Sequence, residues 1–131
     1  MSAVLLDTHA WIWSLMAPSR LGGAAEAAIA AADSVFVSPI SMYELTRKAK
    51  LGGWPEILPH LDELVAETET LTVPFTRETA ARAALLDWRH RDPFDRFIAA
   101  TAIELRCPLV SKDAEFDSLN SEADWPGRVW S

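Results

Sequence analysis

Four acidic residues stand where short apolar runs of the sequence end, or in the first turns of the helical patterns between them. Asp7 directly follows the run Ala3–Leu6, Glu44 and Asp95 each lie near the start of a predicted helix, and Asp113 lies two residues beyond the fourth run. Carboxylates held within a few ångströms repel, so either their pKa values rise or a cation neutralises them. Oxygen ligands without cysteine suit Mg²⁺ or Mn²⁺. Two such ions could hold the attacking and leaving oxygens of a phosphodiester.

Each of these acids also has a simpler structural explanation. Asp7 could cap the helix that follows it, and Glu44 could complete a capping box with Ser41. Asp95 could favour the dipole of its helix, and Asp113 could be an ordinary turn residue. Singly, none of the four is specific. The hypothesis of a shared site depends on whether the fold brings them together.

The elements that would position these acids alternate along the chain. Short apolar runs predict strands over Ala3–Leu6, Val35–Val37, Leu71–Phe75 and Leu109–Ser111, with a further strand over Arg128–Trp130. The segments between them predict helices beginning near His9, over Gly23–Ala32, from Pro39 to Gly52, over Pro55–Glu67, over Thr76–Trp88, and from Pro93 to about Leu105. This alternation predicts an α/β fold with a central, mostly parallel, twisted sheet of four to five strands covered on both faces. Ligands of such sheets bind beyond the carboxyl ends of the strands, where the four acids would lie.

The composition of the chain excludes several classes of protein. The 131 residues suit one domain over residues 1–131, and a hydrophobic half with 24% charged residues argues against disorder. The net charge of −7 argues against indiscriminate nucleic-acid binding, although a local basic patch remains compatible with it. A single cysteine, Cys107, excludes an internal disulfide and a cysteine-based zinc site. We expect a cytoplasmic protein, because neither a signal-like start nor an apolar stretch of about 20 residues is present.

Basic side chains near two of the acids are candidates for contacts with phosphate groups. They are Arg47, Lys48 and Lys50 after Glu44, and Arg89, Arg91 and Arg96 around Asp95. The alternative for both clusters is a solvated helix end. His9 and His90 flank the acidic motifs, and for each we expect a buried or capping role rather than metal ligation.

Five segments carry recognisable motifs, in this order along the chain: Leu5-Leu6-Asp7-Thr8-His9, Val37–Leu45, Lys50-Leu51-Gly52, His90–Ala100 and Leu109–Asp113. Together they resemble the PIN-domain ribonucleases, and among them the VapC-type toxins of toxin–antitoxin pairs. Any one segment is weak, but their order and spacing over about 110 residues are typical of that family.

The resemblance implies an α/β/α sandwich and a metal-dependent endoribonuclease. The implied acidic site, both metal-binding and catalytic, consists of Asp7, Glu44, Asp95 and Asp113, with Thr8 and Ser111 as supporting polar residues. It also implies Mg²⁺ or Mn²⁺ as cofactor, an RNA substrate, a homodimer, and a cognate antitoxin whose C-terminal segment lies across the active-site groove. Among the acids, we expect Asp113 to orient or deprotonate the attacking water, because it lies on a short turn.

Two other readings remain open. The chain could be a non-catalytic PIN-like module that only binds a partner. It could also be a haloacid-dehalogenase-like phosphatase with Asp7 as nucleophile. That chemistry usually needs a second aspartate two residues later, where this sequence has His9, and room for a cap that 131 residues hardly provide.

Overall fold

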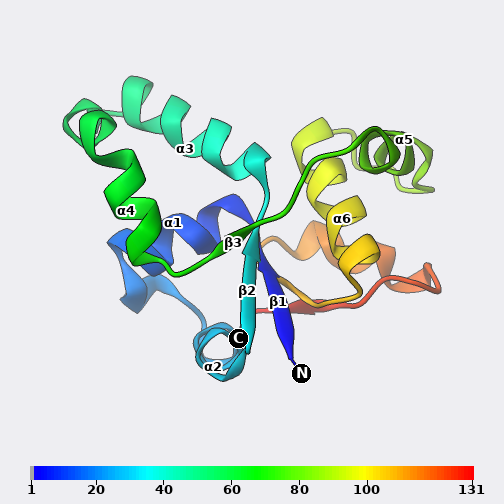
Figure 1. The fold of residues 1–131 in the computed structure, drawn as a ribbon. Helices are drawn as coiled ribbons and strands as arrows, with labels where there is room; N and C mark the ends of the chain where they lie inside the picture. Colours follow the sequence, from blue (N-terminus) through cyan, green and yellow to red (C-terminus); the bar gives the residue numbers. More distant parts are fainter. Residues whose placement is uncertain (1) are drawn as a thin grey trace.

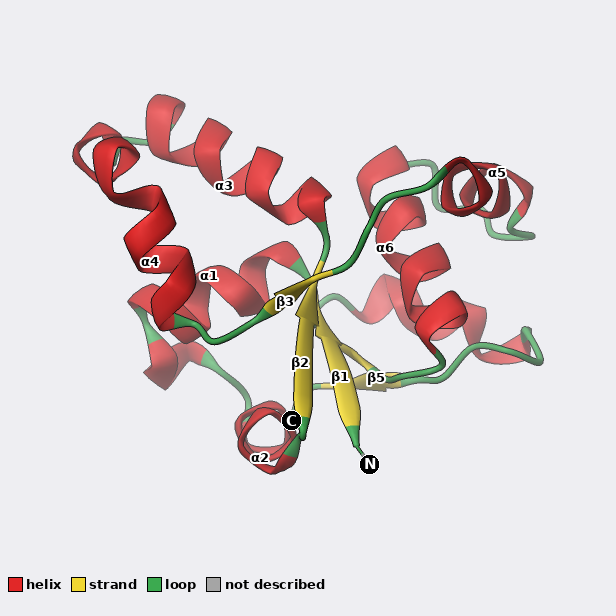
Figure 2. Ribbon diagram, in the orientation of Figure 1, coloured by secondary structure: helices red, strands yellow, loops and turns green. Residues whose placement is uncertain are grey.

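A computed structural model describes residues 2–131, and its centre is a five-stranded sheet in which all neighbouring strands are parallel. The strands are β1 (Ala3–Leu6), β2 (Ser34–Val37), β3 (Leu71–Thr72), β4 (Leu109–Val110) and β5 (Arg128–Val129). Their order across the sheet is β3-β2-β1-β4-β5, so β1 lies in the middle (Figure 2). The prediction of a parallel α/β sheet is confirmed, and the C-terminal strand supplies its fifth member.

Helices cover both faces of this sheet. They are α1 (Thr8–Met16), α2 (Gly23–Ala31), α3 (Pro39–Leu51), α4 (Leu61–Glu67), α5 (Arg77–Leu85) and α6 (Pro93–Leu105), with 3₁₀ helices η1 (Pro18–Arg20), η2 (Pro55–His60) and η3 (Ala114–Ser121). Figure 1 shows α1 to α4 on one side of the strands and α5 and α6 on the other. None of the helices within residues 2–131 is long and apolar enough to cross a membrane.

Successive residues of β1 point into two different cores, as the period of a strand requires. Leu5 packs with the buried residues of α6 and with Phe116 of η3. Val4 and Leu6 pack on the opposite face with Trp11 of α1 and with residues of α2 and α3. Because both faces are covered, the central strand is apolar throughout and its first polar residue comes directly at its carboxyl end.

Three elements differ from their predicted bounds by more than one residue. The helix expected over 55–67 is divided into η2 and α4, and Pro59 inside η2 has no N–H to continue an α-helical ladder. The strand expected over 71–75 ends at Thr72, before Pro74, which cannot donate to a neighbouring strand. The helix expected over 76–88 ends at Leu85.

Candidate metal centre

The carboxyl end of β1 is where the strand order of the sheet reverses. From β1 the chain adds β2 and β3 on one side, then returns to add β4 and β5 on the other. The backbone N–H of Asp7 donates to the carbonyl of Val110 at 3.1 Å, so the ends of β1 and β4 lie side by side. Ligands of open parallel sheets bind at such a reversal. Asp7 follows one of these strands and Ser111 follows the other.

Asp7 is a buried carboxylate that also caps a helix. Its Oδ1 accepts a hydrogen bond from the N–H of Ala10 at 2.8 Å, and only 8% of the residue is exposed. Burial raises the pKa of Asp7 from 3.8 to about 6, although the Ser111 hydroxyl and the Ala10 N–H oppose this rise. The charges of Asp95 and Glu44 raise it further. Asp7 therefore does cap α1, as the simpler explanation proposed. Capping does not require a buried carboxylate, however, so it does not explain the burial of Asp7.

Glu44 projects from α3 toward the first helix. It accepts a hydrogen bond from the Thr8 hydroxyl at 2.5 Å, and that hydroxyl lies 3.0 Å from the hydroxyl of Ser41. Ser38, rather than Ser41, caps α3, since its Oγ accepts from the N–H of Ile40. The capping-box explanation of Glu44 is therefore wrong. Burial raises the pKa of Glu44 despite the hydrogen bond from Thr8.

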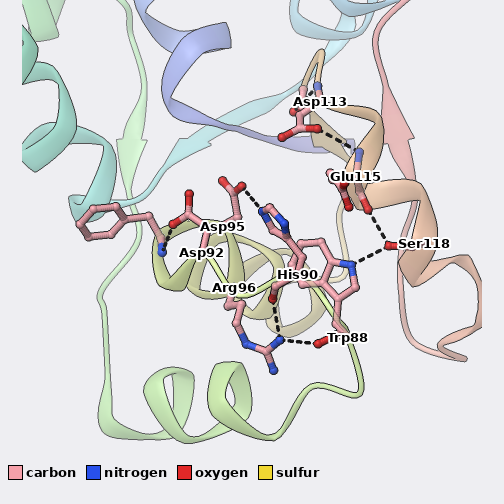
Figure 3. A network of polar contacts seen from close by, with 10 residues as sticks. Trp88, His90, Asp92, Asp95, Arg96, Asp113, Glu115 and Ser118 are labelled. Atoms are coloured by element: carbon pink, nitrogen blue, oxygen red, sulfur yellow. Dashed lines mark hydrogen bonds and ion pairs between the residues drawn. The ribbon is translucent and has the colours of Figure 1, made fainter.

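Asp95 lies in the first turn of α6, one turn after the residue that caps this helix. Asp92 is the cap, and its Oδ1 accepts from the N–H of Phe94 at 2.9 Å. Oδ2 of Asp95 lies 2.7 Å from Nε2 of His90 (Figure 3). Burial raises the pKa of Asp95, although its hydrogen bond with His90 lowers it. With Asp92 as the cap, the Asp95 carboxylate is left for other contacts.

Asp113 is the most exposed of the four acids. Its Oδ1 accepts from the N–H of Glu115 at 2.9 Å and so caps η3, while its own N–H donates to the Ser111 hydroxyl at 3.0 Å. Ligand atoms of His90, Asp95 and Asp113 all lie within 4.8 Å of one another. The turn expected at Asp113 is therefore the start of the 3₁₀ helix η3, and Oδ1 of Asp113 is occupied by the backbone N–H of Glu115.

Among the described residues, the group whose ligand atoms lie within 4.8 Å of one another contains Asp95 and Asp113 but not Asp7 or Glu44, which are coupled to the other acids through their charges. The negative charges of Glu44 and Asp95 act on Asp7, and that of Asp113 acts on Asp95. Burial is the main cause of the raised pKa values of Asp7, Glu44 and Asp95, and neighbouring carboxylates add a smaller contribution. Carboxylate oxygens are the donors that suit Mg²⁺ or Mn²⁺, and the imidazole of His90 lies beside them.

A groove with aromatic and basic walls begins beside Glu44. Its volume is about 380 Å³, and its lining residues are Tyr43, Glu44, Arg47, Lys48, Leu51, Gly52 and Phe94. The ring of Tyr43, which is 51% exposed, lies 5.6 Å from that of Phe94. Sequence reasoning missed this aromatic pair, although each ring stands one position before a site acid. Arg47 and Lys48 are exposed and reach the groove, whereas Lys50 is exposed outside its lining.

Arg96 does not belong to the RNA-contact candidates. Its five N–H groups donate to five backbone carbonyls, namely those of Ala83, Ala84, Leu86, Trp88 and His90. The prediction of a phosphate contact at Arg96 is therefore wrong, because each donor of its guanidinium is engaged. Arg89 and Arg91 are exposed on the same segment.

The two histidines behave differently. His9 is exposed and its ring lies 5.7 Å from that of Trp13, so neither the buried nor the capping role expected for it is correct. His90 is half-buried and contacts a site acid directly. The sequence signals for His90 were its place five residues before Asp95 and at the start of the family-like segment His90–Ala100.

The fold and the acidic crevice define a known class: the chain belongs to the PIN domain family, whose model matches residues 4–121. It is 40% identical to ribonuclease VapC22 from Mycobacterium tuberculosis over 132 residues, which cover 99% of this chain and 100% of that protein.

Solved structures share the fold at lower sequence identity. The crystal structure of VapBC2 from Rickettsia felis bound to a DNA fragment from their promoter matches with a TM-score of 0.70 and 14% identity, covering 98% of this chain and 99% of that one. A toxin–antitoxin complex from Klebsiella pneumoniae matches with a TM-score of 0.65 and 18% identity, covering 92% and 93%.

Proposed function

We propose that this protein is a metal-dependent endoribonuclease that acts as the toxin of a toxin–antitoxin pair. The observation that carries the proposal is the placement of acids at the strand-order reversal: Asp7 is buried where β1 ends beside β4, and ligand atoms of Asp95 and Asp113 lie within 4.8 Å of each other. Membership of the PIN domain family and 40% identity to a ribonuclease support the same activity.

The cofactor in this proposal is Mg²⁺ or Mn²⁺, held by Asp7 and Asp95 with Glu44 and Asp113 around them. When bound, the cation supplies an acidified water and neutralises charge on the phosphate. Thr8 fixes the Glu44 carboxylate by its hydrogen bond, and Ser111 stabilises the negative charge of Asp7. These contacts hold the acids in place before substrate arrives, which lowers the cost of organising the site.

Asp113 is the residue we assign to the attacking water. One of its oxygens is engaged by the backbone of η3, so the carboxylate is fixed, while its exposure leaves the other oxygen open to solvent. A carboxylate held in this way can orient a water molecule and accept its proton as the phosphorus–oxygen bond forms.

RNA would enter along the groove beside Glu44. Arg47 and Lys48 offer positive charge to phosphates in a chain whose net charge is −7, and Tyr43 offers an exposed ring face on which a base can stack. Lys50 and Arg91, exposed nearby in sequence, extend the same surface in this proposal.

The proposed partners are a cognate antitoxin and a second copy of the chain, in the cytoplasm. The likeness to the VapBC and toxin–antitoxin structures supports an antitoxin partner. An antitoxin segment lying over the groove would block both the cations and the RNA path, which is a simple physical route to inhibition.

Cleavage of RNA by the purified protein tests the proposal. We expect cleavage with Mg²⁺ or Mn²⁺, none with EDTA, and loss of activity in Asp95→Asn. Asp92→Asn is the matched control, because asparagine caps a helix as well as aspartate does and Asp92 is exposed. Equal cleavage by Asp95→Asn and the wild type would refute the assignment. A metal-binding protein that cleaves no RNA would favour the non-catalytic module, and an aspartyl-phosphate at Asp7 would favour the phosphatase.

A further inference from the structure

The contact between His90 and Asp95 joins a loop to a site acid. Nε2 of His90 lies 2.7 Å from Oδ2 of Asp95, and the two side chains are 23% and 24% exposed. The loop between α5 and α6 carries His90 back over the first turn of α6, so the imidazole approaches the carboxylate from the side (Figure 3). This contact fills one oxygen of Asp95 and leaves Oδ1 for a cation.

His90 is itself held on two sides. Nη1 of Arg96 donates to the carbonyls of Trp88 at 2.8 Å and of His90 at 2.9 Å, which fixes the backbone of the loop. The ring of Trp88 lies 4.9 Å from the imidazole and limits its rotation. A side chain held at its backbone and on its ring face loses little further freedom when it forms a hydrogen bond.

The same loop contacts the element that begins at Asp113. Nε1 of Trp88 donates to the hydroxyl of Ser118 in η3 at 2.6 Å, and this hydroxyl donates to the carbonyl of Glu115 at 2.7 Å (Figure 3). The N–H of Glu115 in turn donates to Asp113. One short segment therefore contacts both Asp95 and the helix that Asp113 caps.

We propose that His90 is a positioning residue that fixes the Asp95 carboxylate through its Nε2–H, so that Oδ1 of Asp95 is presented to the cation. The proposal rests on the metal site of the proposed function. The terminal torsion of an aspartate is broad, so without a partner its oxygens would exchange places. Second-shell partners of metal ligands are typically worth about 10–100-fold in metal affinity.

A competing effect acts in the opposite direction. A positively charged imidazole beside the site would repel a divalent cation, so its removal by itself would strengthen metal binding. The two effects predict opposite signs, which makes the affinity of the metal-free protein for Mn²⁺ a decisive measurement. Glutamine separates them, because its amide keeps an N–H donor near the position of Nε2 but carries no charge.

Calorimetric titration with Mn²⁺ of the wild type, His90→Leu and His90→Gln is the test. Leucine keeps the apolar contact with Trp88 but donates no hydrogen bond, and urea unfolding reports whether each variant is folded. We expect His90→Leu to bind Mn²⁺ about 10–100-fold more weakly and His90→Gln to recover most of the loss. His60→Leu is the control, since His60 is exposed and pairs with Glu63 at 3.9 Å in the next helix; it should bind Mn²⁺ as the wild type does.

Three results would overturn the proposal. Equal or tighter binding by His90→Leu would show that charge repulsion outweighs positioning. Equally weak binding by both variants would show that the imidazole nitrogen is needed as a ligand. A wild type that does not bind Mn²⁺ would remove the site altogether. The titration contains no RNA and is therefore independent of nuclease activity. If Mn²⁺ binding depended on His90 but the protein cleaved no RNA, the nuclease function would be refuted and the role of His90 would stand.

Discussion

Replacing Asp7 by asparagine should stabilise the metal-free protein at neutral pH while removing its metal binding. Burial raises the pKa of Asp7 from 3.8 to about 6. At 1.36 kcal/mol per pKa unit, the ionised carboxylate costs the folded state about 3 kcal/mol above pH 6. Asparagine keeps the acceptor for the Ala10 N–H without the charge, so the cap is preserved.

The sign of the pH dependence follows from the raised pKa. The wild type has its full stability from this group below pH 3.8, where Asp7 is protonated in both folded and unfolded states, and loses it as the pH rises through about 6. The advantage of Asp7→Asn should therefore be about 0.5 kcal/mol at pH 4 and reach about 3 kcal/mol at pH 7.5.

Urea unfolding in EDTA at a series of pH values measures this advantage. Adding Mg²⁺ at neutral pH should stabilise the wild type but leave Asp7→Asn unchanged, because only a folded state with its ligand intact binds the cation. Asp92→Asn serves as the control, because Asp92 is exposed and is not one of the four site acids, and Mg²⁺ should stabilise this variant as it does the wild type. A constant difference between pH 4 and 7.5, or an Asp7→Asn protein less stable than the wild type at pH 7.5, would refute the reasoning.

Three further predictions concern RNA binding and folding. The double variant Arg47→Gln, Lys48→Gln should bind single-stranded RNA more weakly and reduce the salt slope of log K by about 1.4; an unchanged slope would exclude these phosphate contacts. Arg96→Lys should cost about 2–4 kcal/mol in urea unfolding, because three donors cannot serve five carbonyls, and an unchanged midpoint would contradict this. Gly22→Ala should cost about 1–3 kcal/mol, since a Cβ there would lie 2.0 Å from a backbone oxygen, whereas Gly23→Ala, with open space around it, should not.

The positions of the acids along the elements could be predicted from local patterns. Short apolar runs end just before Asp7 and Asp113, and a parallel sheet brings such ends to one edge. The Asp92-Pro93 pair correctly predicts the start of α6 and leaves Asp95 one turn inside it. Their roles in metal binding and catalysis remain predictions for the experiments above.

Long-range contacts explain what local patterns missed. The predicted helix through Trp88 ends at Leu85, and beyond its end the carbonyls of Leu86 and Trp88 accept hydrogen bonds from Arg96. The same contacts bring His90 to Asp95, which no spacing rule anticipates. Arg96 was predicted to contact RNA because it is a basic residue next to an acidic motif. The sequence does not show that its N–H groups point to backbone carbonyls.

The most direct test of the central claim is the position of Mn²⁺ in a crystal of the protein, located by its anomalous scattering. We expect a peak about 2 Å from carboxylate oxygens of both Asp7 and Asp95, with Glu44 and Asp113 around it. A peak bound elsewhere, or no peak in crystals saturated with Mn²⁺, would contradict the account.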